Sequence, residues 1–478
     1  MQKAVHLRDG TGVLRMTISA LALGLAFTAF PTLGEPFSCA GAKAPAAAPS
    51  QSKTFDGEWV GPLVIGPIHT WAAIRISGDR AAAATGLGPF DDGHAAFEGG
   101  KAHVDLGEGG TLDGPVDFQG NVWAAHWVVK DAPDRTLQLV RRPQTPVPPL
   151  PYRSEDVTFR GADGTVVAGT VTAPMDTTPH PAVILLTGSQ PADRDYVPRG
   201  APPAHRPFAV LADRLTRQGF VVLRYDSRGV GGSGGSFVGD PEAQFEGDIV
   251  AALALLRARP DVDTKKVGLI GHSAGSVLAA RGAVADPSVA FVVLLAPPGM
   301  PAKEFATAQI EAIGKSEGAS DAELARRIKV SEALNAAALA ASDPADAKVK
   351  VAQVAAELQR EGIYKNLGQY DVTIALAPSD YYRFFLTHDP AADLRQLHQP
   401  VLVISGSKDI LTPPDTQLPP IRAALKDNRQ ADVCVIPGLS HQLRLATTGS
   451  FEEAEASMIT IDDTALDPIV SWLALHTR

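Results

Sequence analysis

The chain has 478 residues, too many for one compact core, so its length predicts two or three folded units. Hydrophobic residues make up 45% of the chain and charged residues 20%, a composition that excludes an intrinsically disordered protein. The 43 basic and 53 acidic residues give a formal net charge of −10. An acidic chain without a basic run lacks the electrostatic footprint of a nucleic-acid-binding protein, and an anionic membrane surface would repel it.

Residues 1–42 are typical of a secretory signal peptide. Three basic residues precede an apolar, uncharged run over residues 16–30. A run of about 15 residues suits the hydrophobic segment of a signal peptide and is short for a membrane-spanning helix. Small residues at 32–34 and 40–42 are candidate cleavage sites. We therefore expect a periplasmic or secreted protein without stable membrane insertion after cleavage. An uncleaved N-terminal anchor and lipidation of Cys39 are the alternatives.

The chain contains two cysteines, Cys39 and Cys434. Cleavage after Ala42 would leave only Cys434, so we expect no internal disulfide in the mature protein. Cys434 lies in the apolar run 433–436, and we interpret it as an inert side chain packed in the core.

Residues 54–142 are predicted to form a small β-rich domain. Short runs of strand-forming residues, separated by turn residues, favour a small antiparallel sheet or barrel. These runs cover residues 59–65, 71–76, 122–129 and 136–140. The histidines of this region are scattered without metal-ligand spacing. We therefore expect neither a metal site nor another cofactor here, and no catalytic residues.

A proline-rich stretch over residues 143–151 predicts a semi-rigid boundary before the last unit, residues 152–478. That unit begins with a predicted hairpin over residues 157–172. Continuous apolar runs then alternate with helical patterns, which indicates a mostly parallel sheet covered by helices on both faces. The apolar runs cover 182–186, 220–225, 267–270, 291–295, 400–404 and 432–436, and the helical patterns cover 205–218, 241–258, 274–284, 415–427 and 464–476.

Residues 300–395 interrupt this alternation. They are rich in Ala, Glu, Lys and Gln, have high helical propensity, and contain no strand pattern. A long helical insertion between two strands predicts a cap over the carboxyl edge of the sheet, where ligands bind in such folds. The predicted fold class is therefore α/β, with a mostly parallel sheet and a helical cap, preceded by the small β-rich domain.

Gly271-His272-Ser273-Ala274-Gly275 matches the G-x-S-x-G pattern of a nucleophile elbow. A buried strand is predicted immediately before it and a helix immediately after it, as the elbow requires. Ser273 is therefore the candidate nucleophile, and a serine in a purely structural turn is the alternative. We interpret His272 as structural, because adjacent side chains in a tight turn diverge.

A serine hydroxyl needs a base to remove its proton, and the base needs a carboxylate to orient it. His441 follows the last predicted strand, and Asp409 follows the strand at 400–404. Both loops should lie at the same carboxyl edge of the sheet as Ser273. The chain order Ser, Asp, His is the order that α/β-hydrolases use. Asp415, at the start of the next helix, is the alternative carboxylate.

The oxyanion of an acyl-transfer intermediate needs preorganised N–H donors. One predicted donor is the backbone N–H of Ala274, directly after the nucleophile. The second should come from the loop after the strand at 182–186, where Gly188 permits a sharp bend. There we favour the N–H of Ser189, with Gln190 as the alternative.

Two further motifs carry less specific signals. In Asp193-Arg194-Asp195, Arg194 either lines the rim of the substrate pocket or forms a surface ion pair. The segment 225–229 follows a strand and is interpreted as a structural turn. Its neighbouring glycines suggest a phosphate loop, but no Lys-Ser/Thr pair follows, so we expect no nucleotide binding.

Taken together, these motifs resemble a bacterial family of exported α/β-hydrolase esterases, close to serine-aminopeptidase-like and dienelactone-hydrolase-like groups. The family commonly has Gly where this chain has Gln190. The Gln190 amide could lie near the acyl group of the substrate and change the substrate specificity. The shared motifs lie within about residues 150–478 and cover 186–190, 193–195, 223–226, 228–231, the elbow at Ser273, 382–386 with 389–390, 406–409 and 438–441.

The resemblance implies a serine carboxylesterase that hydrolyses small acyl esters through an acyl-Ser273 intermediate, with His441 activating water to release it. A serine aminopeptidase or thioesterase of the same fold is the first alternative. A non-catalytic binding protein is the second, against which a complete Ser-His-Asp set argues. The expected partner is a small-molecule ester. The sequence does not specify the oligomeric state.

Overall fold

The computed structural model describes residues 55–477 apart from several short segments, and the predicted signal peptide lies outside the described residues. The segments left out are 66–67, 86–87, 90–92, 118–121, 143, 145, 147–148, 198–204, 238–245, 364–376, 451–452, 454–456 and 458. Of the helices in the described part, none is long and apolar enough to cross a membrane.

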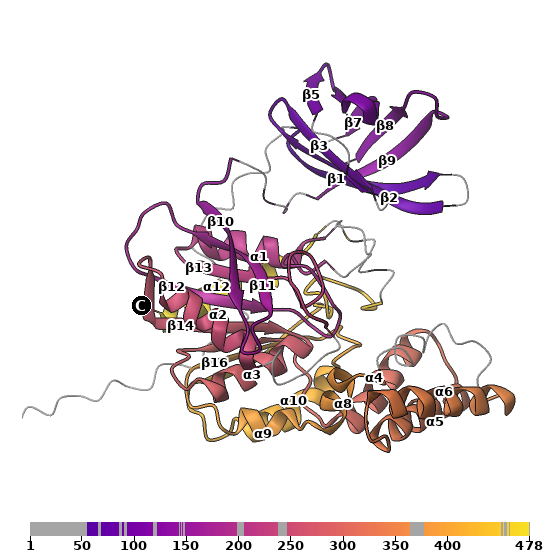
Figure 1. Ribbon diagram of the computed structural model, residues 1–478, viewed down its shortest axis with the longest axis vertical. Coiled ribbons are helices and arrows are strands. Elements are labelled where there is room, and N and C mark those ends of the chain that lie inside the picture. The colour runs from indigo at the N-terminus through magenta and orange to yellow at the C-terminus, as the bar shows by residue number, and fades with distance from the viewer. Residues whose placement is uncertain are drawn as a thin grey trace, which may run out of the picture. The chain divides into compact units, whose positions relative to one another are not determined.

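The β-rich region folds as a closed antiparallel barrel (Figure 1). In the described part, nine strands follow the order β2-β1-β9-β8-β7-β6-β5-β3-β4, and the pairing of β2 with β3 closes the sheet. The sequence predicted either an antiparallel sheet or a barrel, and the pairing of β2 with β3 shows that the region is a barrel. The strands are β1 (Gly57–Ile65), β2 (Ile68–Ser77), β3 (Arg80–Thr85), β4 (Gly88–Pro89), β5 (Gly93–Glu98), β6 (Lys101–Asp105), β7 (Thr111–Asp117), β8 (Val122–Val128) and β9 (Arg135–Arg142).

Large side chains fill the barrel interior. Burial alternates along β6 and β8, as expected when successive residues point inward and outward. Trp59 and Trp123 are fully buried with their ring centroids 6.1 Å apart, and Phe55 meets Trp123 edge-on at 5.1 Å. This barrel therefore encloses a packed aromatic core.

The second sheet follows the order β10-β11-β13-β12-β14-β15-β16-β17. The pairs from β13 through β12 to β17 are parallel, which confirms the prediction of a mostly parallel sheet. The sheet is mixed because the hairpin of β10 and β11 adds antiparallel strands at one edge. The strands are β10 (Arg153–Arg160), β11 (Val166–Ala173), β12 (His180–Leu186), β13 (Val221–Tyr225), β14 (Val262–His272), β15 (Val292–Leu295), β16 (Val401–Gly406) and β17 (Ala431–Ile436).

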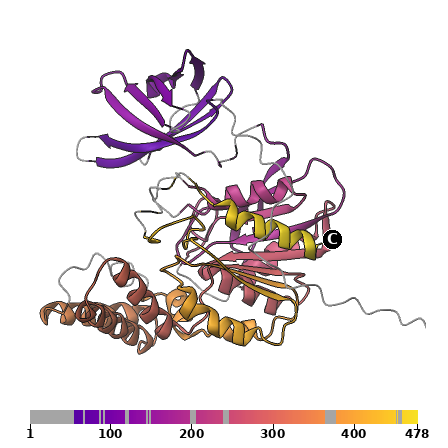
Figure 2. The same cartoon turned by 180° about the vertical axis from the view of Figure 1, so that it is seen from behind.

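Helices cover both faces of this sheet, because its central strands are apolar on both sides. On one face, α1 (Pro207–Arg217) and α12 (Asp463–His476) pack on residues such as Val183 and Leu185. On the other face, α2 (Asp248–Arg257), α3 (Ala274–Ala285) and α10 (Pro414–Ala424) pack on residues such as Ile184 and Leu269. Figure 2 shows α12, in yellow, along its face of the sheet.

Between β15 and β16, the chain forms a helical insertion with a small core of its own (Figure 1, orange). Its helices are α4 (Ala302–Ser316), α5 (Asp321–Leu339), α6 (Pro344–Arg360) and α8 (Asp380–Thr387). Ser320 and Asp343 cap the N-termini of α5 and α6. The next helix, α9 (Pro390–Leu394), packs instead against α3 and α10 in the layer beneath the sheet.

Cys434 lies in β17 and is disulfide-bonded. Cys434 is packed in the core as expected, but the expectation that it is unbonded is wrong, because it assumed that no second cysteine remains. The only other cysteine of the sequence, Cys39, lies outside the described residues.

Parallel pairing brings the carboxyl ends of the central strands to one edge. Leu186 pairs with Gly271, and His272 pairs with Leu295. Farther along the sheet, Gly406 pairs with Ile436. The loops that follow these strands, which carry the predicted site residues, therefore share one edge of the sheet.

Candidate active site

Ser273 occupies a strained turn between β14 and α3. Its backbone has φ 55° and ψ −126°, a conformation that residues other than glycine rarely adopt. The Ser273 N–H donates to the Leu295 carbonyl at 2.8 Å, and the Ser276 N–H donates to the Ser273 carbonyl at 2.9 Å. A side chain at Gly271 would collide with the Gly275 carbonyl. The elbow therefore forms only because small residues flank the serine.

His441 and Asp409 form a buried pair at the same edge. The imidazole Nδ1 lies 2.9 Å from one carboxylate oxygen of Asp409 and 3.1 Å from the other. A carboxylate can only accept, so Nδ1 carries the proton and Nε2 is left as the basic nitrogen. By contrast, Asp415 is exposed on the first turn of α10. The structure thus brings Asp409, and not Asp415, to His441.

The Asp409 carboxylate has further donors in its own loop. One oxygen accepts from the N–H groups of Leu411 at 2.9 Å and Thr412 at 2.7 Å, and the other accepts from the Thr412 hydroxyl at 2.6 Å. Burial alone would raise the pKa of Asp409, but His441 and the Thr412 donors outweigh it and hold this pKa below its usual value. The carboxylate therefore stays ionised. Sequence reasoning missed Thr412, although its spacing of three residues after an aspartate is typical of such turns.

His441 also contacts the nucleophile elbow. Its carbonyl oxygen accepts a hydrogen bond of 2.8 Å from Nε2 of His272, the residue before Ser273. The two imidazole rings lie 4.8 Å apart between centroids. Among the described residues, no hydrogen bond joins the Ser273 hydroxyl to His441. Such bonds commonly tighten only in the complex with substrate.

The predicted oxyanion donors lie at the ends of two adjacent elements. Ala274 is the first residue of α3, so its N–H has no acceptor within the helix. Gly188 follows β12, and a Cβ at this position would lie 3.3 Å from the Ser273 Cβ. The next residues, Ser189 and Gln190, are exposed. Within the described chain, no backbone carbonyl accepts from the Ser189 N–H.

Arg194 is occupied by a network of ion pairs and hydrogen bonds. Its Nε and Nη2 bind the two carboxylate oxygens of the buried Asp226 at 3.0 and 2.8 Å. Its Nη1 binds Asp156 at 2.9 Å and the Gly169 carbonyl at 2.8 Å. Of the two interpretations that the sequence left open, this geometry favours the ion pair. We therefore do not place Arg194 in the substrate site.

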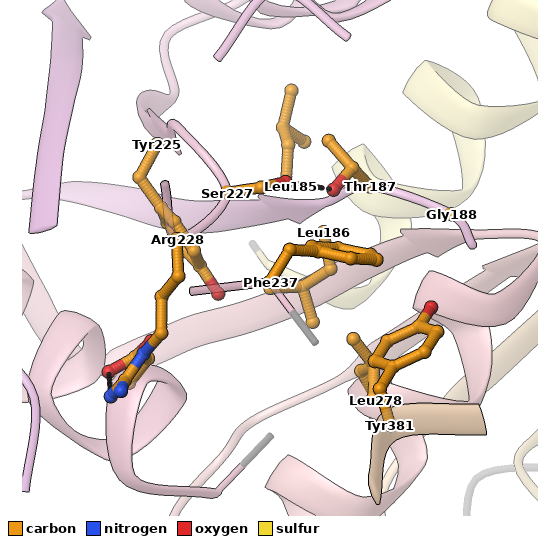
Figure 3. Close-up of a pocket in the computed structure, with 11 residues that line it drawn as sticks. Leu185, Leu186, Thr187, Gly188, Tyr225, Ser227, Arg228, Phe237, Leu278 and Tyr381 are labelled. Atoms are coloured by element: carbon orange, nitrogen blue, oxygen red, sulfur yellow. Dashed lines mark hydrogen bonds and ion pairs between the residues drawn. The ribbon is translucent and has the colours of Figure 1, made fainter. Parts of the chain in front are cut away.

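A pocket lies beside the elbow, next to Gly188 (Figure 3). Its cavity volume is about 40 Å³. Phe237 and the cap residue Tyr381 both line it and pack against each other, with ring centroids 4.5 Å apart. The lining residues are Leu185, Leu186, Thr187, Gly188, Tyr225, Ser227, Arg228, Phe237, Asp248, Leu278 and Tyr381.

Most of the pocket wall is apolar, and its charged part is neutralised. Arg228 donates to both oxygens of Asp248 at 2.7 Å and also binds Asp163 at 2.6 Å. Residues 225–229 thus form the expected structural turn, but they also line the pocket. Sequence reasoning missed Phe237 and Tyr381, which converge on the pocket from distant segments. Within the described residues, no group of three or more His, Cys, Asp or Glu side chains could hold a metal ion.

A serine on a strained strand-to-helix turn, beside an imidazole bonded to a buried carboxylate, defines a hydrolase of the α/β-hydrolase fold. A family model described as "Serine aminopeptidase, S33" matches residues 204–445. The chain therefore belongs to this family, which confirms the predicted resemblance to serine-aminopeptidase-like α/β-hydrolases.

Two relatives are similar in sequence to parts of this chain. Esterase EstD of Thermotoga maritima is 27% identical over 337 residues, which cover 68% of this chain and 69% of the relative. Thiohydrolase apmlB of Arthrinium phaeospermum is 30% identical over 150 residues, or 31% of this chain and 44% of the relative.

Two solved structures are more distantly similar. An esterase of Pyrococcus furiosus has 16% identity and a TM-score of 0.42, with coverage of 68% of this chain and 92% of the other. An esterase of Pyrobaculum calidifontis has 20% identity and a TM-score of 0.40, with coverage of 68% and 87%.

Proposed function

We propose that this protein is a serine carboxylesterase that hydrolyses small acyl esters through an acyl-Ser273 intermediate. The Ser273 hydroxyl attacks the ester carbonyl while His441 Nε2 takes its proton. The N–H groups of Ser189 and Ala274 stabilise the oxyanion. The intermediate then collapses, the C–O bond to the alcohol breaks, and His441 gives the proton to the leaving alcohol. A water molecule, deprotonated by His441, releases the acid and restores Ser273.

The observation that carries this proposal is the buried Asp409–His441 pair beside the strained Ser273. The ionised Asp409 holds Nδ1–H of His441 and stabilises the imidazolium that forms at each proton transfer. The similarity to Esterase EstD over two thirds of the chain supports ester hydrolysis.

The pocket beside Gly188 supports a small acyl group. Its cavity of about 40 Å³ has room for only a few atoms. Its wall is largely aliphatic and aromatic, and includes Leu278 of α3 and Phe237. We therefore assign the pocket to the acyl chain of the substrate and expect short chains, such as acetyl, to be preferred.

The serine aminopeptidase alternative has support in the name of the family. A peptidase of this kind needs a carboxylate to bind the substrate's ammonium group. Among the described lining residues, Asp248 is the only carboxylate, and Arg228 already binds both of its oxygens. In the cap, Glu304 is exposed and Glu311 pairs with Lys315. These contacts favour an ester over an aminoacyl substrate.

A substrate panel tests this proposal directly. Purified protein would be assayed on p-nitrophenyl esters of increasing acyl length, on aminoacyl anilides and on acyl thioesters. We expect the highest kcat/KM on the shortest esters and no turnover by Ser273→Ala. A fluorophosphonate should label the wild type and leave Ser273→Ala unlabelled. Faster cleavage of the anilides would favour an aminopeptidase, and faster cleavage of the thioesters would favour a thioesterase. If the fluorophosphonate does not label the wild type, the protein is better explained as a non-catalytic binding protein.

A substitution in the pocket sharpens the acyl-chain assignment. Phe237→Ala should raise the ratio of activity on hexanoyl to acetyl esters by at least about 10- to 200-fold, the discrimination that a single methylene produces in a hydrophobic pocket. Phe385→Ala is the matched control, because Phe385 contacts Tyr381 on the same helix but does not line the pocket. An unchanged ratio in Phe237→Ala would remove the acyl chain from this pocket.

We also propose that the protein is exported to the periplasm or the medium. The leader at residues 1–42 supports this, because basic residues followed by an apolar run of about 15 residues are typical of a secretory signal peptide. Fractionation of expressing bacteria and N-terminal sequencing of the recovered protein test it. Loss of the leader supports export, and an intact Met1 in a reduced cytoplasmic protein contradicts it.

A further inference from the structure

Tyr196 has an unusual backbone conformation close to the site. Its φ is 66°, in the left-handed region that bulky residues rarely adopt. The cost of such a conformation, commonly placed at functional sites, must be offset by the surrounding structure. Tyr196 is not one of the residues used in the mechanism above, so its strain needs a separate explanation.

A tight turn holds Tyr196 in this conformation. The Tyr196 N–H donates to the Asp193 carbonyl at 2.9 Å. The Asp193 carboxylate accepts from the N–H groups of Asp195 at 3.0 Å and Val197 at 2.9 Å. Arg194 anchors the same turn to Asp226. The motif at 193–195, which resembles that of related esterases, therefore serves to present the next residue, Tyr196.

Tyr196 connects the elbow to the His441 loop through His272. The Tyr196 hydroxyl lies 3.0 Å from His272 Nδ1, and His272 Nε2 lies 2.8 Å from the His441 carbonyl oxygen. A carbonyl can only accept, so His272 Nε2 carries a proton. Burial lowers the pKa of His272 to about 3, so the ring is neutral and its Nδ1 is unprotonated. The Tyr196 hydroxyl must therefore donate to Nδ1, which fixes the direction of both bonds.

The same hydroxyl touches the loop that carries the oxyanion donor. Its oxygen lies against Gly188, because a Cβ at position 188 would come within 2.3 Å of it. Tyr196 thus contacts the residue before Ser189 on one side and the residue before Ser273 on the other. Phe208 packs against its ring at 4.8 Å and limits its movement.

We propose that Tyr196 is a positioning residue: acting through His272, it holds the His441 loop against the nucleophile elbow. The Tyr196 hydroxyl selects the His272 tautomer that donates to the His441 carbonyl. Without that donor, His272 can adopt the other tautomer, in which Nε2 would face the carbonyl as a second acceptor. The bond to the His441 loop would then be lost, and the base would no longer be aligned with Ser273. This inference rests on the proposed serine-hydrolase mechanism.

The test is a double-mutant cycle on Tyr196 and His272. Tyr196→Phe should lower kcat by about 10- to 100-fold, as expected for a small misplacement of catalytic groups, with KM within about twofold. Rates would be expressed per active site titrated with fluorophosphonate, so that a loss of folded protein does not count. His272→Gln keeps a donor for the His441 carbonyl and should retain more activity than His272→Leu. In the His272→Leu background, Tyr196→Phe should cost less than about twofold.

Tyr152→Phe is the matched control, because the Tyr152 hydroxyl bonds Asp213 away from the site. An unchanged kcat per titrated site in Tyr196→Phe would overturn the proposal. The proposal would also be overturned if Tyr196→Phe lowered kcat as much in the His272→Leu background as in the wild type. The rate of fluorophosphonate labelling gives the same comparison without an ester. If the wild type is labelled but hydrolyses no ester, the carboxylesterase assignment fails and the labelling rates still test the role of Tyr196.

Discussion

The barrel interior and the carboxyl edge of the mixed sheet are both tightly packed, but with different chemistry. The barrel encloses Trp59, Trp123 and Phe55 in aromatic contact. The sheet edge buries His272, Asp409 and His441, each hydrogen-bonded to a defined neighbour. Burying polar groups costs free energy unless each group has a hydrogen-bond partner. A buried cluster of titratable side chains with defined partners is therefore better explained by catalysis than by stability. The comparison assigns stability to the barrel core and catalysis to the sheet edge.

The largest expected effect comes from the sheet edge. Asp409→Asn should lower kcat by about 10⁴-fold, because an amide in place of the carboxylate no longer holds Nδ1–H of His441 and favours the wrong tautomer. Steady-state assays on a short p-nitrophenyl ester measure this. Asp415→Asn, at an exposed position on α10, should keep wild-type activity. If only the Asp415 variant lost activity, the orienting carboxylate would be reassigned.

The second prediction concerns the barrel core. Trp123→Ala should lower the free energy of unfolding of the barrel by about 3–5 kcal/mol, because it removes a fully buried indole and leaves a cavity. Four of the five tryptophans belong to barrel strands, so denaturant unfolding followed by tryptophan fluorescence reports on this part of the chain. The kcat per titrated active site should stay at its wild-type value. A large drop in that kcat would show that the barrel contributes to catalysis and would break the comparison.

The smallest expected effect is a difference in how the free energy of unfolding depends on pH. An unfolded histidine titrates near pH 6.5, whereas burial lowers the pKa of folded His272 to about 3. Between these values the folded protein binds fewer protons than the unfolded chain, so His272 makes stability fall as the pH falls from about 6.5. Each pH unit in this window costs up to about 1.4 kcal/mol. Denaturant unfolding of the wild type and of His272→Gln between pH 4.5 and 6.5 measures the slope.

His272→Gln should show the shallower slope, because its side chain does not titrate. Asp409 does not interfere, because its pKa is lowered and its stabilising effect is lost only below the range measured. Trp123→Ala serves as the control: it should lower stability by the same amount at every pH. Equal slopes in the wild type and in His272→Gln would contradict the buried, neutral state of His272.

Most of the sheet could be predicted from the sequence, because the patterns that indicate strands and the elbow lie within short segments of the chain. Continuous apolar runs marked β12 to β17, and the small residues around Ser273 marked the elbow. The chain order placed Asp409 and His441 in loops at one edge, since parallel strands share that edge. These signals need no knowledge of how distant side chains pack.

Other features depended on contacts that the sequence does not encode locally. Arg194 has the same local sequence whether it binds substrate or Asp226, and only the fold brings Asp226 to it. Phe237 and Tyr381 lie far apart in the chain and meet only at the pocket. His272 was expected to be structural, but its bond to the His441 carbonyl required the position of a loop about 170 residues away. Cys434 was misjudged because the expectation depended on where the leader is cleaved.

The insertion between β15 and β16 has an evolutionary consequence. These two strands are parallel neighbours in the sheet, with Val292 paired to Val401, so the chain leaves the carboxyl edge after β15 and returns to the opposite edge before β16, and the insertion lies within this crossover. The entropic cost of closing a loop grows only slowly with its length, so such a segment can lengthen, shorten or be exchanged without altering the strands. Because α8 contributes Tyr381 to the pocket, each exchange would present a new wall to the substrate. A lineage built on this scaffold can therefore diversify its substrates while its proton-transfer residues stay in place.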